Sequence, residues 1–291
     1  MKLNTFYNTL RRRLYRKEIL YAMVLSFFIM IVSYLVESSL EIKSLIDTIH
    51  RMNSGFPEYT LYTPETAERL KHIYLETTAS QTLSFYIFME DGYTIYNFIA
   101  HFIITLPVLM FIQDRQNGTE QLIALRNKTG NYLASEGISI CLTVGILILV
   151  PSILFWGISY LITPTNFPLT QSFPPYPEDF FQILGQEKNV AWKYLALILL
   201  NAMLFTSKAF LAFSVSLRIQ KKVTILFVPI IFSYALQIIC TLFGLHNYGR
   251  ITYFDSLIES LAPVFVTMMI HILFAVVILT ITNVKERSLN G

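Results

Sequence analysis

The stretch QDRQNGTEQLIALRNKTG, residues 113–130, is a polar interval between two long apolar segments. Asn117 is a residue type that caps helix N-termini, and Glu120 stands three residues later, as in a capping box. Leu122 and Leu125 then share one helical face. The pattern predicts a short amphipathic helix held between two membrane spans. A helix in that position can receive force from a partner and pass it into both spans.

The composition is that of a chain embedded in a lipid bilayer. Of 291 residues, 54% are hydrophobic and 14% are charged, and the mean hydropathy is +0.53. Soluble domains carry about 25% charged residues, so a membrane location explains the deficit. Cys141 and Cys240 both lie in apolar runs, which favours buried, inert thiols over any redox role.

Six apolar runs have the length of spanning helices, about 17–25 residues. Pro107 should kink or loosen the second of them. No small-x-small cleavage site follows Val36, so we expect the first run to be retained as a span. The sequence predicts an all-α polytopic membrane protein, one transmembrane domain over residues 1–291. Its predicted spans are residues 19–36, 93–112, 138–162, 194–217, 223–245 and 263–282.

The segment before the first span is basic and amphipathic. Phe6, Leu10 and Leu14 recur at helical spacing among arginines within residues 1–18. This pattern predicts an N-terminal interfacial helix under the cytoplasmic leaflet, with its apolar side toward the lipid. A solvated basic tail is the alternative interpretation.

The sequence patterns of two longer connections also predict helices. Residues 37–92 are acidic and predict a small helical extracytoplasmic insertion between the first two spans. The first span is expected to continue as a helix until residues 53–57, and Thr63-Pro64-Glu65 is a start signal for a second helix. Residues 246–260 predict a partly embedded helix before the last span.

The distribution of basic residues predicts the orientation. Lys and Arg favour cytoplasmic segments. With the N-terminus inside, fourteen of the 22 basic residues fall in inner segments and six in outer ones. The orientation is therefore N-in/C-in, which places residues 113–136 in the cytoplasm as a coupling loop.

The sequence lacks the motifs of common catalytic and nucleotide sites. It contains no Gly-x-x-x-x-Gly-Lys-Ser/Thr, no His-Glu-x-x-His, no Gly-x-Ser-x-Gly and no Cys or His cluster at metal-ligand spacing. Basic residues stand at membrane boundaries, where orientation accounts for them, so no nucleic-acid partner is expected. The chain is not expected to be an enzyme, because the spans lack an acid pair, a metal set and a nucleophile–base pair.

Polar residues inside the spans are functional candidates by default. For Lys208, snorkelling to the cytoplasmic interface is favoured over a charge that faces the bundle or a dimer partner. For His101 and His271, a neutral, hydrogen-bonded interior histidine is favoured over a proton relay, since no predicted span holds Asp or Glu. Asn201 and Gln237 are candidates for hydrogen bonds between helices.

Two short motifs lie in and after the opening stretch. One is Asp114-x-x-x-Gly118-Thr119, followed by Leu122 and Leu125-Arg126, and the other is Thr129-x-x-Tyr132-Leu133. Together with the six-span layout, they resemble the permease subunits of ABC-2 type ATP-binding-cassette exporters. The first motif is similar to the family's acidic-x-x-x-Gly-Thr and coupling-helix stretch. The second is similar to its continuation into the third span, which often carries Lys where this chain has Glu136.

This resemblance implies the membrane half of an ATP-driven exporter. Low Gly, many Phe and Tyr and the lack of an evident cleavable signal peptide fit a bacterial plasma membrane. Such permeases pair as homodimers or heterodimers, and separate ATPase subunits bind ATP and Mg and dock on the coupling helices. The chain itself would then hold no cofactor. The residues expected to couple to the ATPase are Asp114, Arg115, Asn117, Gly118, Thr119, Glu120, Leu122, Leu125 and Arg126.

A second hypothesis is a non-transporting membrane protein. In this interpretation the chain is a sensor or an immunity protein that binds a ligand through residues 37–92. It would then function without an ATPase partner, which separates it from the exporter hypothesis.

Overall fold

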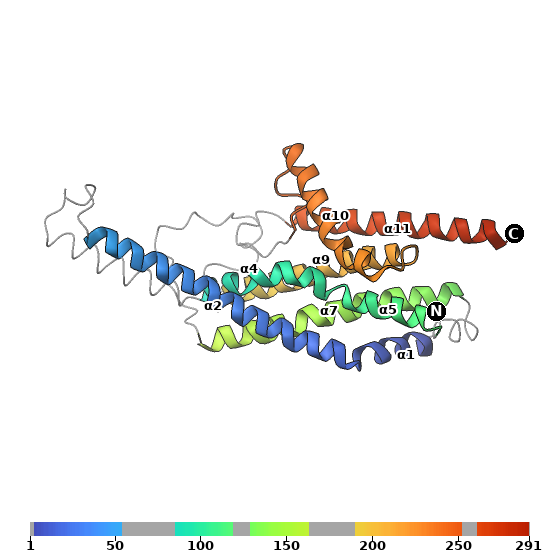
Figure 1. Cartoon of the computed structure of the whole chain (residues 1–291), viewed down its shortest axis with the longest axis horizontal. Coiled ribbons are helices and arrows are strands. Elements are labelled where there is room, and N and C mark those ends of the chain that lie inside the picture. Colours follow the sequence, from blue (N-terminus) through green and yellow to red (C-terminus); the bar gives the residue numbers. More distant parts are fainter. Residues whose placement is uncertain (1–2, 54–84, 119–128, 163–189, 252–260, 291) are drawn as a thin grey trace.

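The computed structural model describes residues 3–53, 85–118, 129–162, 190–251 and 261–290, and these ranges contain helices and turns but no strand. The chain folds into a bundle of long helices (Figure 1). In chain order the helices are α1 (Leu3–Leu14), α2 (Lys17–Asn53), α4 (Phe85–Ile103), α5 (Leu106–Gln116), α7 (Thr129–Ile162), α9 (Val190–Ser216), α10 (Lys222–Leu242) and α11 (Ala262–Asn290).

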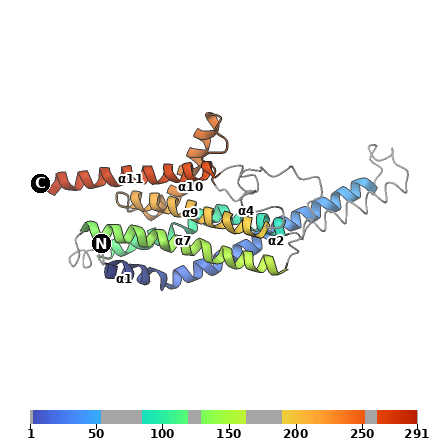
Figure 2. The same cartoon turned by 180° about the vertical axis from the view of Figure 1, so that it is seen from behind.

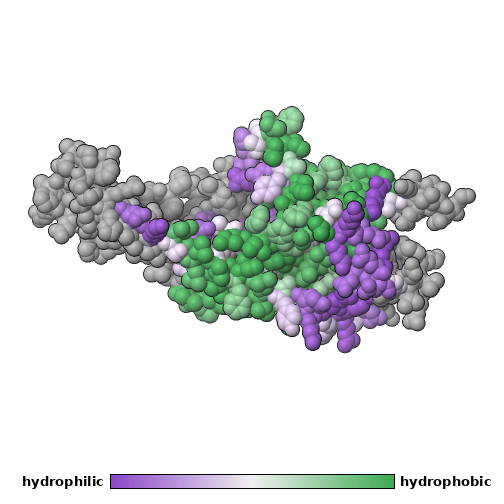
Figure 3. Space-filling model, in the orientation of Figure 1, coloured by the Kyte–Doolittle hydropathy of each residue, from purple (hydrophilic) through white to green (hydrophobic). Residues whose placement is uncertain are grey.

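Six stretches within the described residues are long and apolar enough to cross a membrane, which confirms the predicted all-helical, multi-pass class. A broad hydrophobic band covers the middle of the molecule, and hydrophilic surface gathers at the end where α1 lies (Figure 3). The six stretches are Lys17–Leu40, Phe88–Gln116, Tyr132–Ile162, Tyr194–Ser216, Lys222–Leu242 and Ala262–Thr282.

The second span is broken where its sequence carries proline. α4 ends at Ile103 and α5 begins at Leu106, so that Pro107 stands in the first turn of the second piece. A proline there lacks only an N–H that the helix start leaves unpaired anyway. The Thr105 hydroxyl donates to the Phe102 carbonyl across the break, at 2.7 Å. The predicted effect of Pro107 is therefore confirmed.

The central helix of the bundle is α9, which packs against α7 on one side and α11 on another (Figure 1, Figure 2). Its buried positions lie on more than one face and include Leu197, Ile198 and Leu204. A helix that is apolar all round belongs in an interior. By contrast, α10 lies at an angle to the other helices and leaves most of its apolar surface uncovered.

Buried apolar side chains form two clusters that meet at the break in the second span. The larger cluster joins α2, α4, α7, α9 and the start of α11. The smaller one gathers around α5, where Phe111 lies edge-on to Phe213 of α9 at 5.2 Å. Its buried members are Val108, Phe111, Ile112, Ile140, Ala212, Phe213 and Ile225.

The N-terminal helix runs along the bundle beside the first part of α7 (Figure 1). Among residues 6–14, the part of this helix whose side chains are described, the buried ones are polar: Thr9 and Arg13 lie one turn apart and face the protein. Phe6, Leu10 and Leu14, the predicted lipid-facing set, are half-buried. The interfacial position stays a prediction, but the best-covered face of this helix meets protein and carries a charge.

Several predicted boundaries can be compared directly. The first span continues as a helix to Asn53, as predicted. The second helix of the insertion lies outside the described residues. So does most of the predicted embedded helix, since residues 252–260 are not described. Residues 246–251, the described part of that connection, contain turns and bends but no helix.

Gly92 sets the distance between α4 and α7. A Cβ atom at this position would collide with the ring of Phe155, which is itself packed between Phe88 and Tyr93. At Gly157, also in α7, a Cβ atom would meet nothing within 4 Å. The same substitution by alanine at these two glycines therefore differs in its effect on packing but not in its effect on helix propensity.

We therefore expect Gly92→Ala to be less stable than Gly157→Ala by about 1–3 kcal/mol, because only the first overpacks a core. Thermal unfolding of the two purified proteins in the same detergent measures this difference. Both variants gain the same helix propensity from alanine. Equal stability of the two would contradict the close packing at Gly92.

Candidate functional site

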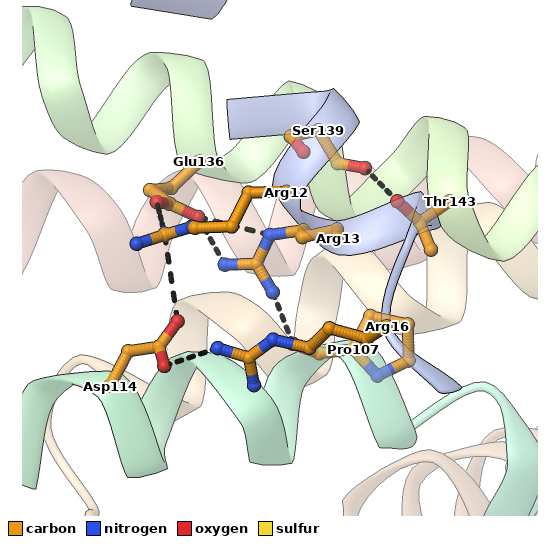
Figure 4. A network of polar contacts seen from close by, with 8 residues as sticks. All are labelled: Arg12, Arg13, Arg16, Pro107, Asp114, Glu136, Ser139 and Thr143. Atoms are coloured by element: carbon orange, nitrogen blue, oxygen red, sulfur yellow. Dashed lines mark hydrogen bonds and ion pairs between the residues drawn. The ribbon is translucent and has the colours of Figure 1, made fainter. Parts of the chain in front are cut away.

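An arginine–carboxylate cluster lies at the end of the bundle that carries α1 (Figure 4). It consists of Arg12, Arg13 and Arg16 with Asp114 and Glu136. The arginines come from α1 and from the link between α1 and α2, and the acids come from α5 and α7. Three guanidinium groups face two carboxylates, which leaves one net positive charge.

The innermost pair is Arg13 with Glu136. Their side chains are 1% and 0% exposed. Arg13 donates from Nε to Glu136 Oε2 at 3.1 Å, and its Nη2 also pairs with that oxygen. The Arg13 Nη1 donates to the Pro107 carbonyl at 2.7 Å. Each of the three nitrogens of this buried guanidinium thus has an acceptor, as a buried charge requires.

Arg12 connects the two acids. Its Nη2 donates to Glu136 Oε1 at 2.9 Å and lies 3.5 Å from Asp114 Oδ2. Arg16 donates to the other oxygen of Asp114 at 2.5 Å. Arg12 and Arg16 are 29% and 26% exposed, so water screens this part of the cluster more than the inner pair.

The two acids stand on either side of the predicted coupling segment. Asp114 is in the last turn of α5, and Glu136 is near the start of α7. Both therefore pair with Arg12 of the same short helix, α1. The ends of the connection between α5 and α7 are tied together through α1.

The end of α5 is also tied to the turn between α9 and α10. Arg115 donates to the Leu217 carbonyl and Gln116 to the Gln220 carbonyl, each at 3.3 Å. These bonds join two connections at the same end of the bundle.

The predicted N-cap at Asn117 is wrong. Asn117 is the C-cap of α5, and its N–H donates to the Gln113 carbonyl at 3.0 Å. Gly118 follows with φ +72°, the left-handed conformation in which glycine ends helices. Residues 113–116 thus belong to α5. Thr119, Glu120, Leu122, Leu125 and Arg126, the rest of the predicted coupling set, lie outside the described residues.

A second polar cluster lies inside the bundle, around Lys208 of α9. This side chain is fully buried, so the favoured snorkelling interpretation is wrong and the bundle-facing alternative holds. Its Nζ donates to the Ile251 carbonyl at 2.5 Å and to His101 Nε2 at 2.9 Å. The rotation of α9 causes the difference, because it turns Lys208 toward His101 of α4.

Both histidines are interior and hydrogen-bonded, as predicted. His101 Nδ1 lies 2.8 Å from the Asn97 carbonyl and His271 Nδ1 lies 2.7 Å from the Thr267 carbonyl. A carbonyl only accepts, so Nδ1 carries the proton in each ring and Nε2 is left as an acceptor. His101 uses that acceptor for Lys208.

The two amide candidates behave differently. Asn201 of α9 donates to Asn97 of α4 at 3.2 Å, so its predicted bond between helices is confirmed. Gln237 Oε1 is buried and finds no hydrogen-bond partner among the described residues.

The inner members of the arginine cluster were not among the predicted site residues. Arg13 and Glu136 are 123 positions apart, and no local pattern pairs them. One signal was available: Glu136 stands where the resembling family often has Lys. A reversed charge at a span end indicates a basic partner, and three arginines precede the first span.

No family model, no curated protein and no solved structure matches the chain.

We expect Glu136→Gln to lower the free energy of unfolding by about 3–5 kcal/mol, because it leaves the Arg13 guanidinium buried without a carboxylate. Asp114→Asn should cost about 1 kcal/mol or less, since its partners are partly exposed. Denaturant unfolding in detergent measures both, with the exposed Glu18→Gln as the control.

The double variant Arg13→Met/Glu136→Leu tests the pairing itself. It should recover much of the stability lost in Glu136→Gln, because apolar side chains of similar volume replace a buried pair at little cost. A loss in Glu136→Gln no greater than that in Asp114→Asn would show that the buried pair contributes nothing special.

Proposed function

We propose that the chain is the membrane-spanning permease subunit of an ATP-driven ABC exporter. Three observations support this: six helices of spanning length, the resemblance of residues 114–133 to the family's coupling stretch, and the frame built around that stretch. ATP and Mg would be bound by a separate ATPase subunit. The permease would work as a dimer with a second permease chain, with both termini in the cytoplasm of a bacterial cell.

The frame around residues 119–128 is the observation that carries the proposal. A segment that receives force must be attached to what it moves. Asp114 and Glu136 tie both flanks of this segment to Arg12 of α1 by ion pairs, and Arg13 and Arg16 add a second pair to each acid. Arg115 and Gln116 tie one flank to the turn between α9 and α10. A push on the segment would therefore reach α1, α5, α7, α9 and α10 together.

A segment whose flanks are held by ion pairs is better suited than a plain loop to receive force from an ATPase. Buried ion pairs resist separation because breaking one leaves a desolvated charge. The ties would keep the flanking helix ends together while the ATPase closes. The path for the substrate would then form between the two permease chains of the dimer.

The first experiment tests whether the chain binds an ATPase subunit. We expect the tagged full-length chain, purified from its native membrane in mild detergent, to bring with it an ATPase subunit that carries a Walker motif. Leu122→Asp/Leu125→Asp should reduce the retained ATPase and its coupled hydrolysis at least about tenfold, since hot-spot apolar contacts contribute 2 kcal/mol or more each. Mass spectrometry and ATP hydrolysis by the complex are the measurements.

Leu161→Asp is the matched control, because Leu161 is 83% exposed at the opposite end of α7. It should retain the ATPase like the unchanged chain. Normal ATPase retention after replacing residues 117–126 with a flexible Gly-Ser linker would refute the proposal. Function without any ATPase would instead support the sensor or immunity protein.

A further inference from the structure

The surface of the arginine–carboxylate cluster is cationic. The side chains of its two acids are nearly covered, with Asp114 10% and Glu136 0% exposed, whereas those of Arg12 and Arg16 are 29% and 26% exposed. The carboxylates therefore lie inside and the two guanidinium groups reach the surface. Hydrophilic surface gathers at this end of the molecule, next to the hydrophobic band (Figure 3).

Asp114 holds these two guanidinium groups next to each other. Arg12 Nη2 lies 3.5 Å from one of its oxygens, and Arg16 Nη2 donates to the other at 2.5 Å (Figure 4). The Nε and Nη1 donors of both arginines have no acceptor among the described residues. Guanidinium groups bind phosphate oxygens through such paired N–H donors. The cluster thus presents unused phosphate-binding donors whose spacing one carboxylate sets.

Two further cations extend this surface. Arg11 and Lys17 are exposed and pair with no carboxylate among the described residues. The Arg11 guanidinium lies over the ring of Tyr15, 5.6 Å from its centre, and that ring is 80% exposed. With both acids of the cluster and the exposed Glu18 counted, the surface keeps a net charge of +2. We use the name cationic rim for Arg11, Arg12, Arg16 and Lys17.

The exposed apolar surface of α2 begins directly after the cationic rim. Lys17 is the first residue of a spanning stretch that runs to Leu40. Leu20, Val24 and Phe28 follow at helical spacing and are 58%, 48% and 56% exposed. A row of exposed apolar side chains that ends at cationic groups is complementary to an anionic phospholipid, whose acyl chains end at a charged headgroup.

We propose that the cationic rim binds the phosphate of an anionic phospholipid, with an acyl chain along the exposed row of α2. The free donors of Arg12 and Arg16 bind the phosphate oxygens, and the other two members of the rim supply further positive charge. A zwitterionic lipid has the same phosphate, but its ammonium group cancels the charge. Selectivity for an anionic headgroup therefore distinguishes this site from general contact with lipid. The site does not depend on the chain being an exporter.

Native mass spectrometry of the full-length chain in detergent measures the binding. The probes are phosphatidylglycerol and phosphatidylcholine with identical acyl chains, titrated separately. We expect phosphatidylglycerol to bind at least about tenfold more tightly, because each Lys or Arg close to an anionic surface strengthens binding about fivefold. Equal affinity for the two lipids would overturn the proposal.

Arg11→Gln/Lys17→Gln removes two exposed charges that take no part in the ion pairs of the cluster. It should weaken phosphatidylglycerol binding at least about tenfold and leave phosphatidylcholine binding unchanged. The matched control is Lys221→Gln/Lys222→Gln, which removes two exposed cations from the turn between α9 and α10 at the same end of the bundle. The control should bind phosphatidylglycerol like the unchanged chain. An equal loss in both double variants would show attraction to overall charge alone and would sink the proposed site.

Arg16→Lys tests the guanidinium donors. The substitution keeps a cation beside Asp114 but replaces the planar fork of N–H groups with an ammonium. Phosphatidylglycerol binding should fall at least about threefold, because the charged hydrogen bonds from the fork are lost. Thermal stability in detergent should change little, since the pair with Asp114 is partly exposed. Unchanged affinity in this variant would contradict the phosphate contact.

A soluble headgroup distinguishes a lipid site from a site for free phosphate. Glycerophosphoglycerol carries the charge of phosphatidylglycerol without its acyl chains. In about hundredfold excess it should leave the lipid bound, because it makes no apolar contact with α2. Displacement of the lipid would assign the cationic rim to soluble phosphate compounds and would refute the lipid site.

Discussion

An ionised side chain inside an apolar bundle has to find opposite charge or a full set of hydrogen bonds, and this requirement shapes both polar clusters of the protein. Glu136 has no exposed surface, so it must be met by cations, and α1 supplies them. The packing of the first helix against the bundle therefore follows from a charge in α7. The arginines and Glu136 are far apart in the sequence, and the fold brings them together.

Lys208 meets the same requirement by a different route. It has carbonyl and imidazole acceptors where Arg13 has a carboxylate. Neutral acceptors compensate a charge less completely than an opposite charge does, so the two sites differ in how firmly they are fixed. The arginine–carboxylate cluster is therefore the more firmly fixed of the two.

The helix set was predictable because lipid imposes length and hydrophobicity on every span, and those properties are local. The end of α5 at Asn117 was not predictable, because the sequence there carries conflicting signals. Asn117 and Glu120 are typical of the start of a helix, whereas Gly118 is typical of its end. The direction of Lys208 depends on the rotation of α9, which packing against α4 and α11 decides. The pairing of Arg13 with Glu136 needed the fold, because the two residues share no segment.

The break at Thr105 gives the second span two mechanical parts. α4 belongs to the larger apolar cluster with α2, whereas α5 has most of its buried apolar side chains in the smaller cluster and is paired with Arg12 of α1 through Asp114. The Pro107 carbonyl beside the break accepts from Arg13. The break at Thr105 thus separates α4 from a second part of the span that is attached to α1. A span built this way can turn motion at one face of a membrane into rotation within it, which a single straight rod cannot do.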